Sequence, residues 1–208
     1  MAGKNGGSEM KTWKMKEVVL TVILAVACGV IYLGWSTLWI PISAVTGPVG
    51  AGFMFGIWVI ASPIVAYIIR KPGAAFIAEV AAAAVELLTG SHFGLAALLV
   101  GVFQGIGSEI AFALFRYKRY NLFTLMLSGA LAAILGMVYN VLANGFGFYT
   151  KGVFLTTLGI HMVSGVILGG CLAKVVVDSL AKTGVLEQYE MMKEKRKKED
   201  INGNVSGM

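Results

Sequence analysis

The chain has 208 residues, of which 57% are hydrophobic and 13% charged, and its formal net charge at pH 7 is +6. So apolar a composition in so short a chain leaves almost no sequence for a separate soluble domain, and it indicates an all-α, polytopic integral membrane protein. We expect a short N-terminal segment (1–16), a membrane domain (17–178) and a basic tail (179–208).

Six apolar segments have about the length that a helix needs to cross the hydrocarbon core of a bilayer, which is roughly 20 residues. The connections between them are short, so consecutive helices must lie antiparallel and adjacent. The sequence therefore predicts a compact bundle of six transmembrane helices. In chain order the segments are Val18–Ile40, Pro48–Ile69, Pro72–Leu88, Phe93–Phe115, Leu122–Leu142 and Val153–Val177.

The basic residues lie almost entirely on one side of this predicted bundle. Of the 17 lysines and arginines, 16 precede the first segment or lie at the ends of the second, fourth and sixth, which leaves Lys151 alone on the other side. Because basic residues are retained on the inner side of a membrane, this pattern predicts that both termini are cytoplasmic. Anionic lipid at the inner leaflet accounts for the positive charge, including the run Lys193–Lys198, and no nucleic acid is required.

Sequence signals for catalysis are weak. Cys28 and Cys171 lie inside apolar segments, without the spacing of a disulfide framework or a metal site. There is no HExxH motif and no phosphate-binding loop. Ser108, in the stretch Gly105–Glu109, only partly resembles an intramembrane serine protease, and it is offset in depth from His161. We therefore expect neither an enzyme nor a resident cofactor or metal.

Two carboxylates in the third segment are the strongest pointer to a binding site. Glu79 and Glu86 are seven residues apart, which places them about 20° apart around a helix and about 10 Å apart along it. Carboxylates are costly at membrane depth and usually face a cavity or a partner. The third helix is therefore predicted to turn an acidic face, rich in alanine and glycine, into the bundle.

Other helices add polar or aromatic side chains to the same interior. Aromatic faces beside carboxylates predict a site for a flat cationic or amidine-like ring, held by cation–π attraction and charge-assisted hydrogen bonds. Glu109 lies nearer the cytoplasmic end, where pairing with Arg116 or Arg119 is an alternative role. With Glu79 and Glu86, the candidate ligand-binding residues are Trp35, Trp58, Gln104, Glu109, Tyr139, Asn140 and His161.

Two classes of transport protein fit such a bundle. A stand-alone secondary transporter for a small organic cation would commonly carry internal repeats around a midplane site, and no convincing repeat is visible between the halves of this sequence. A binding subunit that takes its energy from partner proteins needs no such repeat. Both hypotheses remain open from the residues alone.

Four stretches of the sequence are longer and more specific than a pattern of residue spacing. They are YLGWSTLW (32–39), GPVGAGFMFG (47–56), KPGAAFIAEVAAAAVELLTGSHFG (71–94) and GVFQGIGSEIA (101–111). In these stretches the chain resembles the YkoE-type substrate-binding (S) components of energy-coupling factor (ECF) vitamin transporters. The resemblance covers Glu17–Asp178. It implies a six-helix, multi-pass protein of a prokaryotic cell membrane that binds thiamine or its hydroxymethylpyrimidine moiety.

The resemblance also implies protein partners. S components of this kind associate with a transmembrane coupling protein and two ABC-type ATPases, which hydrolyse the ATP. Their first helix carries small residues that dock on the coupling protein, and Ala25 and Gly29 resemble that small-xxx-small surface. Packing of these two residues within the bundle is the alternative.

Overall fold

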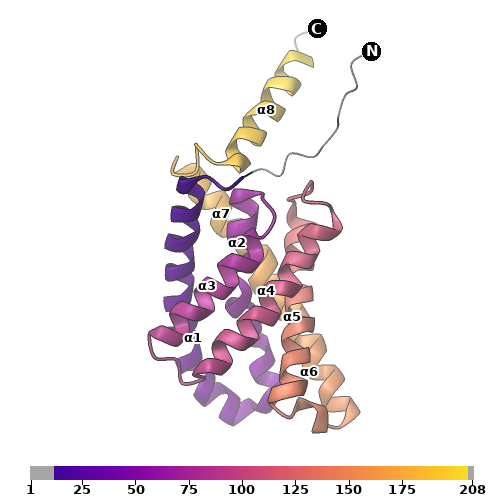
Figure 1. Cartoon of the computed structure of the whole chain (residues 1–208). Helices are drawn as coiled ribbons and strands as arrows, with labels where there is room; N and C mark the ends of the chain where they lie inside the picture. The colour runs from indigo at the N-terminus through magenta and orange to yellow at the C-terminus, as the bar shows by residue number, and fades with distance from the viewer. Residues whose placement is uncertain (1–11, 206–208) are drawn as a thin grey trace, which may run out of the picture.

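The structure is a computed structural model that describes residues 12–205. Within that range it is a bundle of helices without strands, and both ends of the described chain lie at the same end of the bundle (Figure 1). This confirms the all-helical class predicted from composition. The elements in chain order are α1 (Met15–Ala51), the 3-10 helix η1 (Gly52–Val59), α2 (Ala61–Ile69), α3 (Ala74–Leu88), α4 (Leu95–Leu114), α5 (Leu122–Ala143), the 3-10 turn η2 (Phe146–Phe148), α6 (Lys151–Ser164), the π-helical segment η3 (Gly165–Cys171), α7 (Leu172–Lys182) and α8 (Glu190–Val205).

The first two predicted segments are two helical arms that meet at a kink, with almost no break in the helical winding between them. Helix α1 extends past Ile40, through Pro41, to a kink at Gly47, where φ is 65°. Only glycine adopts that conformation freely, so the chain can turn there. The second segment was expected to be a single α-helix, and this is wrong for its first half, because Gly52–Val59 is 3-10 helix. Glycines at positions 52 and 56 permit that tighter winding and a close approach to α6.

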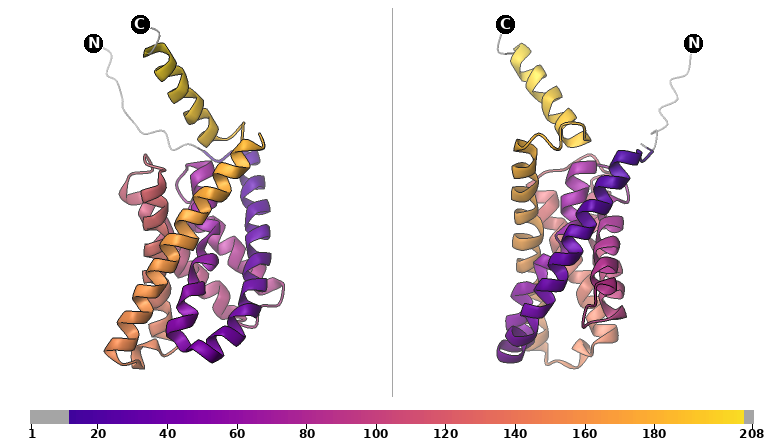
Figure 2. Two further views of the ribbon diagram at one scale, coloured as in Figure 1. Left: turned by 180° about the vertical axis from the view of Figure 1, so that it is seen from behind. Right: turned by 90° about the vertical axis from the view of Figure 1, so that its left-hand side faces the viewer.

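The last predicted segment is longer than expected and contains a wide turn. Helix α6, segment η3 and helix α7 follow one another without a break, and Figure 2 (left) shows them as one long helix across the front of the bundle. In η3 the winding is π-helical, and such turns often accompany functional sites. Gly165 of this segment meets Gly129 of α5, backbone against backbone. A side chain at either position would overlap the other carbonyl group.

The basic tail does not begin as a free segment. Leu186, Tyr189, Met191 and Met192 are buried in the same hydrophobic cluster as α2 and α3, and α8 starts among them. The predicted boundary at residue 178 therefore falls inside a packed unit. Only the later part of α8 projects from the bundle (Figure 1).

The helical runs have the length and composition of membrane spans. Four of them qualify within the described residues: Met15–Ile69, which has 55 residues, Leu95–Leu114, Leu122–Ala143 and Lys151–Lys182. The longest run folds back on itself at the kink, so it supplies two crossings (Figure 1). Helix α3 has 15 residues, or about 22 Å at 1.5 Å per residue, so it is shorter than the hydrocarbon core.

The close contact between α5 and η3 gives a direct test of the packing. Replacing Gly129 by alanine places a methyl group against the Gly165 carbonyl, and we expect a loss of about 1–3 kcal/mol from overpacking. A Cβ atom added at Gly34 would meet no other atom within 4 Å, so alanine there serves as the control and should be neutral or stabilising. Thermal unfolding in detergent measures both variants. Equal melting temperatures for G129A and G34A would contradict the packing described here.

Candidate functional site: an internal cavity with acidic and amide ends

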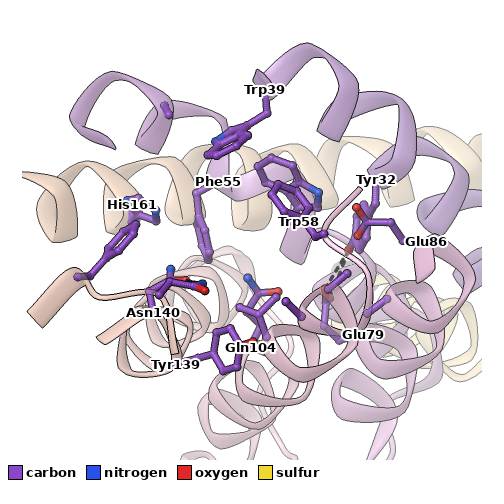
Figure 3. A pocket seen from close by; sticks show the side chains of 18 residues that line it. Tyr32, Trp39, Phe55, Trp58, Glu79, Glu86, Gln104, Tyr139, Asn140 and His161 are labelled. Carbon is purple, nitrogen blue, oxygen red and sulfur yellow. Dashed lines mark hydrogen bonds between the residues drawn. The ribbon is translucent and has the colours of Figure 1, made fainter. Parts of the chain in front are cut away.

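A cavity of about 360 Å³ lies inside the bundle, towards the end opposite Met15 and α8. This volume is within the range of about 300–1,000 Å³ that is common for small-molecule sites. Its walls come from α1, η1, α3, α4, α5 and α6, so helices far apart in the sequence enclose it together. Figure 3 shows the two glutamates at one end of the cavity and His161 and Asn140 at the other.

Glu79 forms the base of the acidic end and is fully buried. The Tyr32 hydroxyl donates to its carboxylate over 3.1 Å, and the Ser62 backbone N–H donates over 3.2 Å. The Ser62 hydroxyl lies 3.0 Å from the same carboxylate and 3.0 Å from the Ala75 carbonyl. Tyr32 in turn accepts from the Ala61 N–H over 3.1 Å. Both oxygens of Glu79 therefore have protein partners, which offset the cost of burying the group.

Glu86 lies one heptad further along α3 and is less completely bonded. Its Oε1 atom lies 2.5 Å from the Ser36 hydroxyl and 3.1 Å from the Ser91 hydroxyl. Within residues 12–205 its Oε2 atom has no hydrogen-bond partner. Glu86 is nevertheless 3% exposed and lines the cavity. This arrangement fixes the carboxylate and leaves one oxygen available to a guest.

The other end of the cavity presents neutral polar groups. The Asn140 carbonyl oxygen accepts from the Asn144 side-chain amide over 2.7 Å, so the Asn140 NH₂ group remains available as a donor. His161 Nδ1 lies 2.8 Å from the Thr157 carbonyl, which requires a proton on Nδ1 and leaves Nε2 as an acceptor in the neutral ring. Gln104 lines the cavity with both amide functions unpaired among the described residues. Donors and acceptors thus occur side by side.

Aromatic rings form the wall between the two ends. Phe55 and Trp58 stand between the glutamates and His161 in Figure 3. Trp58 and Trp39 each meet Phe93 edge to face, with ring centroids 6.1 and 5.3 Å apart. Flat apolar rings at steep angles to one another make a slot that favours a planar, aromatic guest. Tyr139 also lines the cavity, from α5.

Two of the predicted site residues lie elsewhere. The Trp35 indole N–H donates to the Met54 carbonyl over 2.8 Å, which ties α1 to η1 outside the cavity lining. Glu109 accepts from the backbone N–H groups of Gly73, Ala75 and Phe76 over 2.6, 3.0 and 3.1 Å. It therefore caps the N-terminus of α3, where a carboxylate complements the helix dipole, and it pairs with neither Arg116 nor Arg119.

The predicted docking residues also lie inside the bundle. Ala25 is 1% exposed, and a Cβ atom at Gly29 would lie 2.6 Å from the Ala82 carbonyl of α3. Both residues allow α1 and α3 to pack closely, which was the alternative interpretation. The outward face of α1 is formed by other residues.

Seven of the nine candidate residues predicted from the sequence line the cavity, and several other lining residues were not among the candidates. Phe55 belongs to a 3-10 segment, where the helical period that identifies a face does not apply. Phe93 follows Gly90, in the connection between α3 and α4, so it belongs to no helix face. Tyr32 and Trp39 do share the inward side of α1, so the helical period of the sequence could have identified both as lining residues. Asn144 and Phe146 lie at and beyond the end of α5.

Comparisons with known proteins agree with this architecture. Residues 16–135 match the sequence model of a family described as the permease component of an ABC-type cobalt transport system. A Bacillus subtilis (strain 168) protein described as a putative HMP/thiamine permease, YkoE, is 40% identical over 189 residues, which are 91% of this chain and 95% of that protein. A crystal structure of an S component of an ECF transporter superposes with a TM-score of 0.89 at 38% identity, covering 93% of this chain and 98% of that one.

Fold, cavity and comparisons together define a multi-pass membrane protein of a transport system, not an enzyme. More narrowly, the chain belongs to the family of ECF transporter S components. The resemblance seen in the sequence is thereby confirmed.

The position of Glu109 predicts a structural role that can be separated from ligand binding. Replacing Glu109 by glutamine removes the charge from the N-terminus of α3, and we expect a loss of stability of about 1 kcal/mol. Binding of a ligand in the cavity should stay within about twofold, because Glu109 does not line it. Thermal unfolding and calorimetric titration measure the two effects. A large loss of ligand affinity in E109Q without a change in melting temperature would show that Glu109 takes part in ligand binding.

Proposed function

We propose that this S component captures thiamine, or its hydroxymethylpyrimidine moiety, from outside the cell and delivers it to an ATP-driven importer. The observation that carries the proposal is a cavity with an acidic end, an amide and imidazole end, and an aromatic slot between them. The name of the B. subtilis relative supports the same ligands.

The two ends of the cavity complement the two rings of thiamine. The thiazolium ring carries a fixed positive charge, which suits the free Oε2 atom of Glu86 at short range in a medium of low dielectric constant. The aminopyrimidine both donates and accepts hydrogen bonds, and it suits Gln104, Asn140 and His161. Phe55 and Trp58 supply faces and edges for stacking. Glu79 shapes the acidic end because its oxygens already have protein partners.

An organic guest fits the lining better than a metal ion does. The description of the matching family mentions cobalt, which is bound in proteins by groups of nitrogen, oxygen or sulfur ligands. Among the described residues, no group of three or more His, Cys, Asp or Glu side chains could hold a metal ion. Aromatic side chains form much of the cavity wall instead.

The direction of capture follows from the distribution of charge. Both ends of the described chain, the α2–α3 turn and the α4–α5 connection lie at one end of the bundle, and they carry most of the basic residues (Figure 1). The positive-inside rule assigns that end to the cytoplasm. The cavity lies towards the opposite end, so it faces the exterior, where a scavenged vitamin arrives.

The assignment of Glu86 to the cationic ring gives the sharpest test of the ligand. The E86Q variant should bind thiamine at least about tenfold more weakly, which corresponds to about 1.4 kcal/mol, because the fixed charge loses its counterion. Its affinity for hydroxymethylpyrimidine, which lacks the thiazolium ring, should change by less than about threefold. Isothermal titration calorimetry of the purified protein measures both ligands.

Two matched variants control this experiment. E109Q makes the same chemical change outside the cavity and should leave both affinities unchanged. E79Q weakens the bonds to Tyr32 and Ser62, so its main effect should be a lower melting temperature. Wild-type affinity for thiamine in E86Q would remove Glu86 from the site. Equal losses for thiamine and the pyrimidine would place Glu86 at the pyrimidine instead.

For the partner proteins, we propose that the outward face of α1 docks on the coupling protein. Val22, Val26 and Val30 on this face are exposed, as is Gly34, and α1 lies on the outside of the bundle (Figure 2, right). Exposed aliphatic and small residues allow close packing against another transmembrane helix. The fold itself leaves this face uncovered.

Gly34 separates docking from folding. A Cβ atom added at Gly34 would meet no atom of this chain within 4 Å. The G34L variant of the S component should therefore remain stable and bind thiamine normally. Its co-purification with the coupling protein and the ATPases should fall at least about tenfold. Retention of the complex at wild-type yield would place docking elsewhere. G29L is the contrasting variant, because a side chain there clashes with α3 and should lower the melting temperature.

The source of energy distinguishes this proposal from a stand-alone carrier. Thiamine uptake into cells that express the chain should stop when the ATPase subunits are deleted, and it should persist when the proton or sodium gradient is collapsed while ATP is maintained. Uptake that follows a gradient without the ATPases would favour a secondary transporter.

A further inference from the structure

A second cavity lies at the end of the bundle where α1 begins and α8 starts, opposite the first. Its volume is about 570 Å³, and it is bounded by the C-terminal end of α2, the α4–α5 connection, α7 and α8. None of its lining residues belongs to the first cavity. We call it the basic cleft, and the polar residues that line it are Tyr67, Arg70, Tyr120, Lys174, Asp178, Lys182, Glu194 and Lys195.

The basic cleft carries an excess of positive charge after its internal ion pairs are counted. Arg70 pairs with Glu194 over 2.5 Å, and Lys174 pairs with Asp178. Lys182 and Lys195 also line the cleft, and neither forms an ion pair with a described residue. Four cations and two anions leave a net charge of +2. Two ammonium groups at the rim are therefore free to meet an anion.

Aromatic rings hold the central guanidinium of the cleft in place. Arg70 lies over the rings of Tyr67 and Tyr120, with its Cζ atom 5.3 and 5.4 Å from their centroids. Its side-chain Nε–H also donates to the Tyr67 carbonyl over 3.1 Å. A guanidinium that is stacked and fixed on one edge is suited to phosphate oxygens, which accept hydrogen bonds from its planar fork.

The Tyr120 hydroxyl is an unused donor in the same wall. It is buried and has no hydrogen-bond partner among the described residues. Burial raises the pKa of Tyr120, and the nearby carboxylate of Glu109 raises it further, so the hydroxyl keeps its proton. A buried hydroxyl without a partner costs free energy, and an acceptor from a ligand would remove that cost.

We propose that the basic cleft binds a phosphate-bearing anion, with Lys182 and Lys195 contacting its charge and the Tyr120 hydroxyl donating to one of its oxygens. Two sources share this chemistry: the head group of an anionic lipid and a soluble phosphate ester. Basic pockets at the inner side of transmembrane helices recognise lipid head groups in this way. The site is separate from the vitamin cavity and does not depend on its ligand.

Native mass spectrometry tests the lipid arm on the full chain. The protein is reconstituted in phosphatidylcholine nanodiscs with and without a minority of phosphatidylglycerol, and the retained lipid is counted after release. The K182Q/K195Q variant should lose retained phosphatidylglycerol by at least about tenfold relative to wild type. The K193Q/K197Q variant removes the same charge from α8 outside the cleft and should retain the lipid.

The soluble arm uses inorganic pyrophosphate as the probe. Calorimetric titration of protein in a lipid-free detergent should detect binding if the natural ligand is a soluble phosphate ester, with the same dependence on Lys182 and Lys195. Retained phosphatidylglycerol without pyrophosphate binding assigns the cleft to a lipid head group. Absence of both, or equal losses in K182Q/K195Q and K193Q/K197Q, would overturn the proposal.

Tyr120→Phe provides a second, conservative variant. Because the hydroxyl has no partner among the described residues, its removal should not lower the melting temperature. The same change should lower the affinity of the protein for the anion that the two experiments identify by about fivefold or more. A variant that melts lower and binds the anion normally would show that the hydroxyl has a structural role only, against the proposed contact. Unchanged thiamine affinity in all these variants keeps this test independent of the vitamin site.

Discussion

The buried carboxylate of Glu79 joins three helices around one charge-bearing group. Tyr32 comes from α1, Ser62 from the first turn of α2 and Glu79 from the middle of α3. A carboxylate in so apolar a place is costly unless its oxygens are bonded, so these helices are fixed relative to one another by the need to satisfy it. The Ala61 N–H, at the junction between η1 and α2, joins the same network through Tyr32. The acidic end of the cavity is built on this base.

A second constraint shapes the aromatic wall. The 3-10 segment η1 passes close to the last long helix, where the Ser164 hydroxyl lies 2.9 Å from the Gly56 N–H and 2.6 Å from the Phe53 carbonyl. The Ser164 hydroxyl thus accepts from one backbone group of η1 and donates to another three residues earlier, which ties the segment to the end of α6. Phe55 and Trp58 are thereby directed into the cavity. The glycine contact between α5 and η3 brings the remaining wall close enough to enclose it.

Much of this arrangement could be predicted from the sequence, and the exceptions have physical causes. Helix faces were predictable where the period of 3.6 residues holds, which is why Glu79, Glu86 and Gln104 were placed correctly in the interior. That period fails in η1, so Phe55 was missed there. It also indicates only the side of a helix, not the partner met on that side. Glu109 does lie on an inward side, yet it meets the backbone N–H groups of α3 instead of the cavity. Depth along a helix has to come from three-dimensional packing.

The outward face of α1, which we propose as a docking surface, carries almost no polar groups. Its exposed side chains between Val18 and Ile40 are almost all hydrocarbon, and the one hydroxyl among them, on Thr37, is already bonded to the Leu33 carbonyl within the helix. A surface of this kind has no polar bond to break when an acyl chain leaves and a protein helix arrives, and none to gain. Selectivity at this surface must therefore come from shape, and exposed Gly34 is the position on it that lacks a side chain. If this face docks on the coupling protein, as proposed above, release requires only the loss of van der Waals contact.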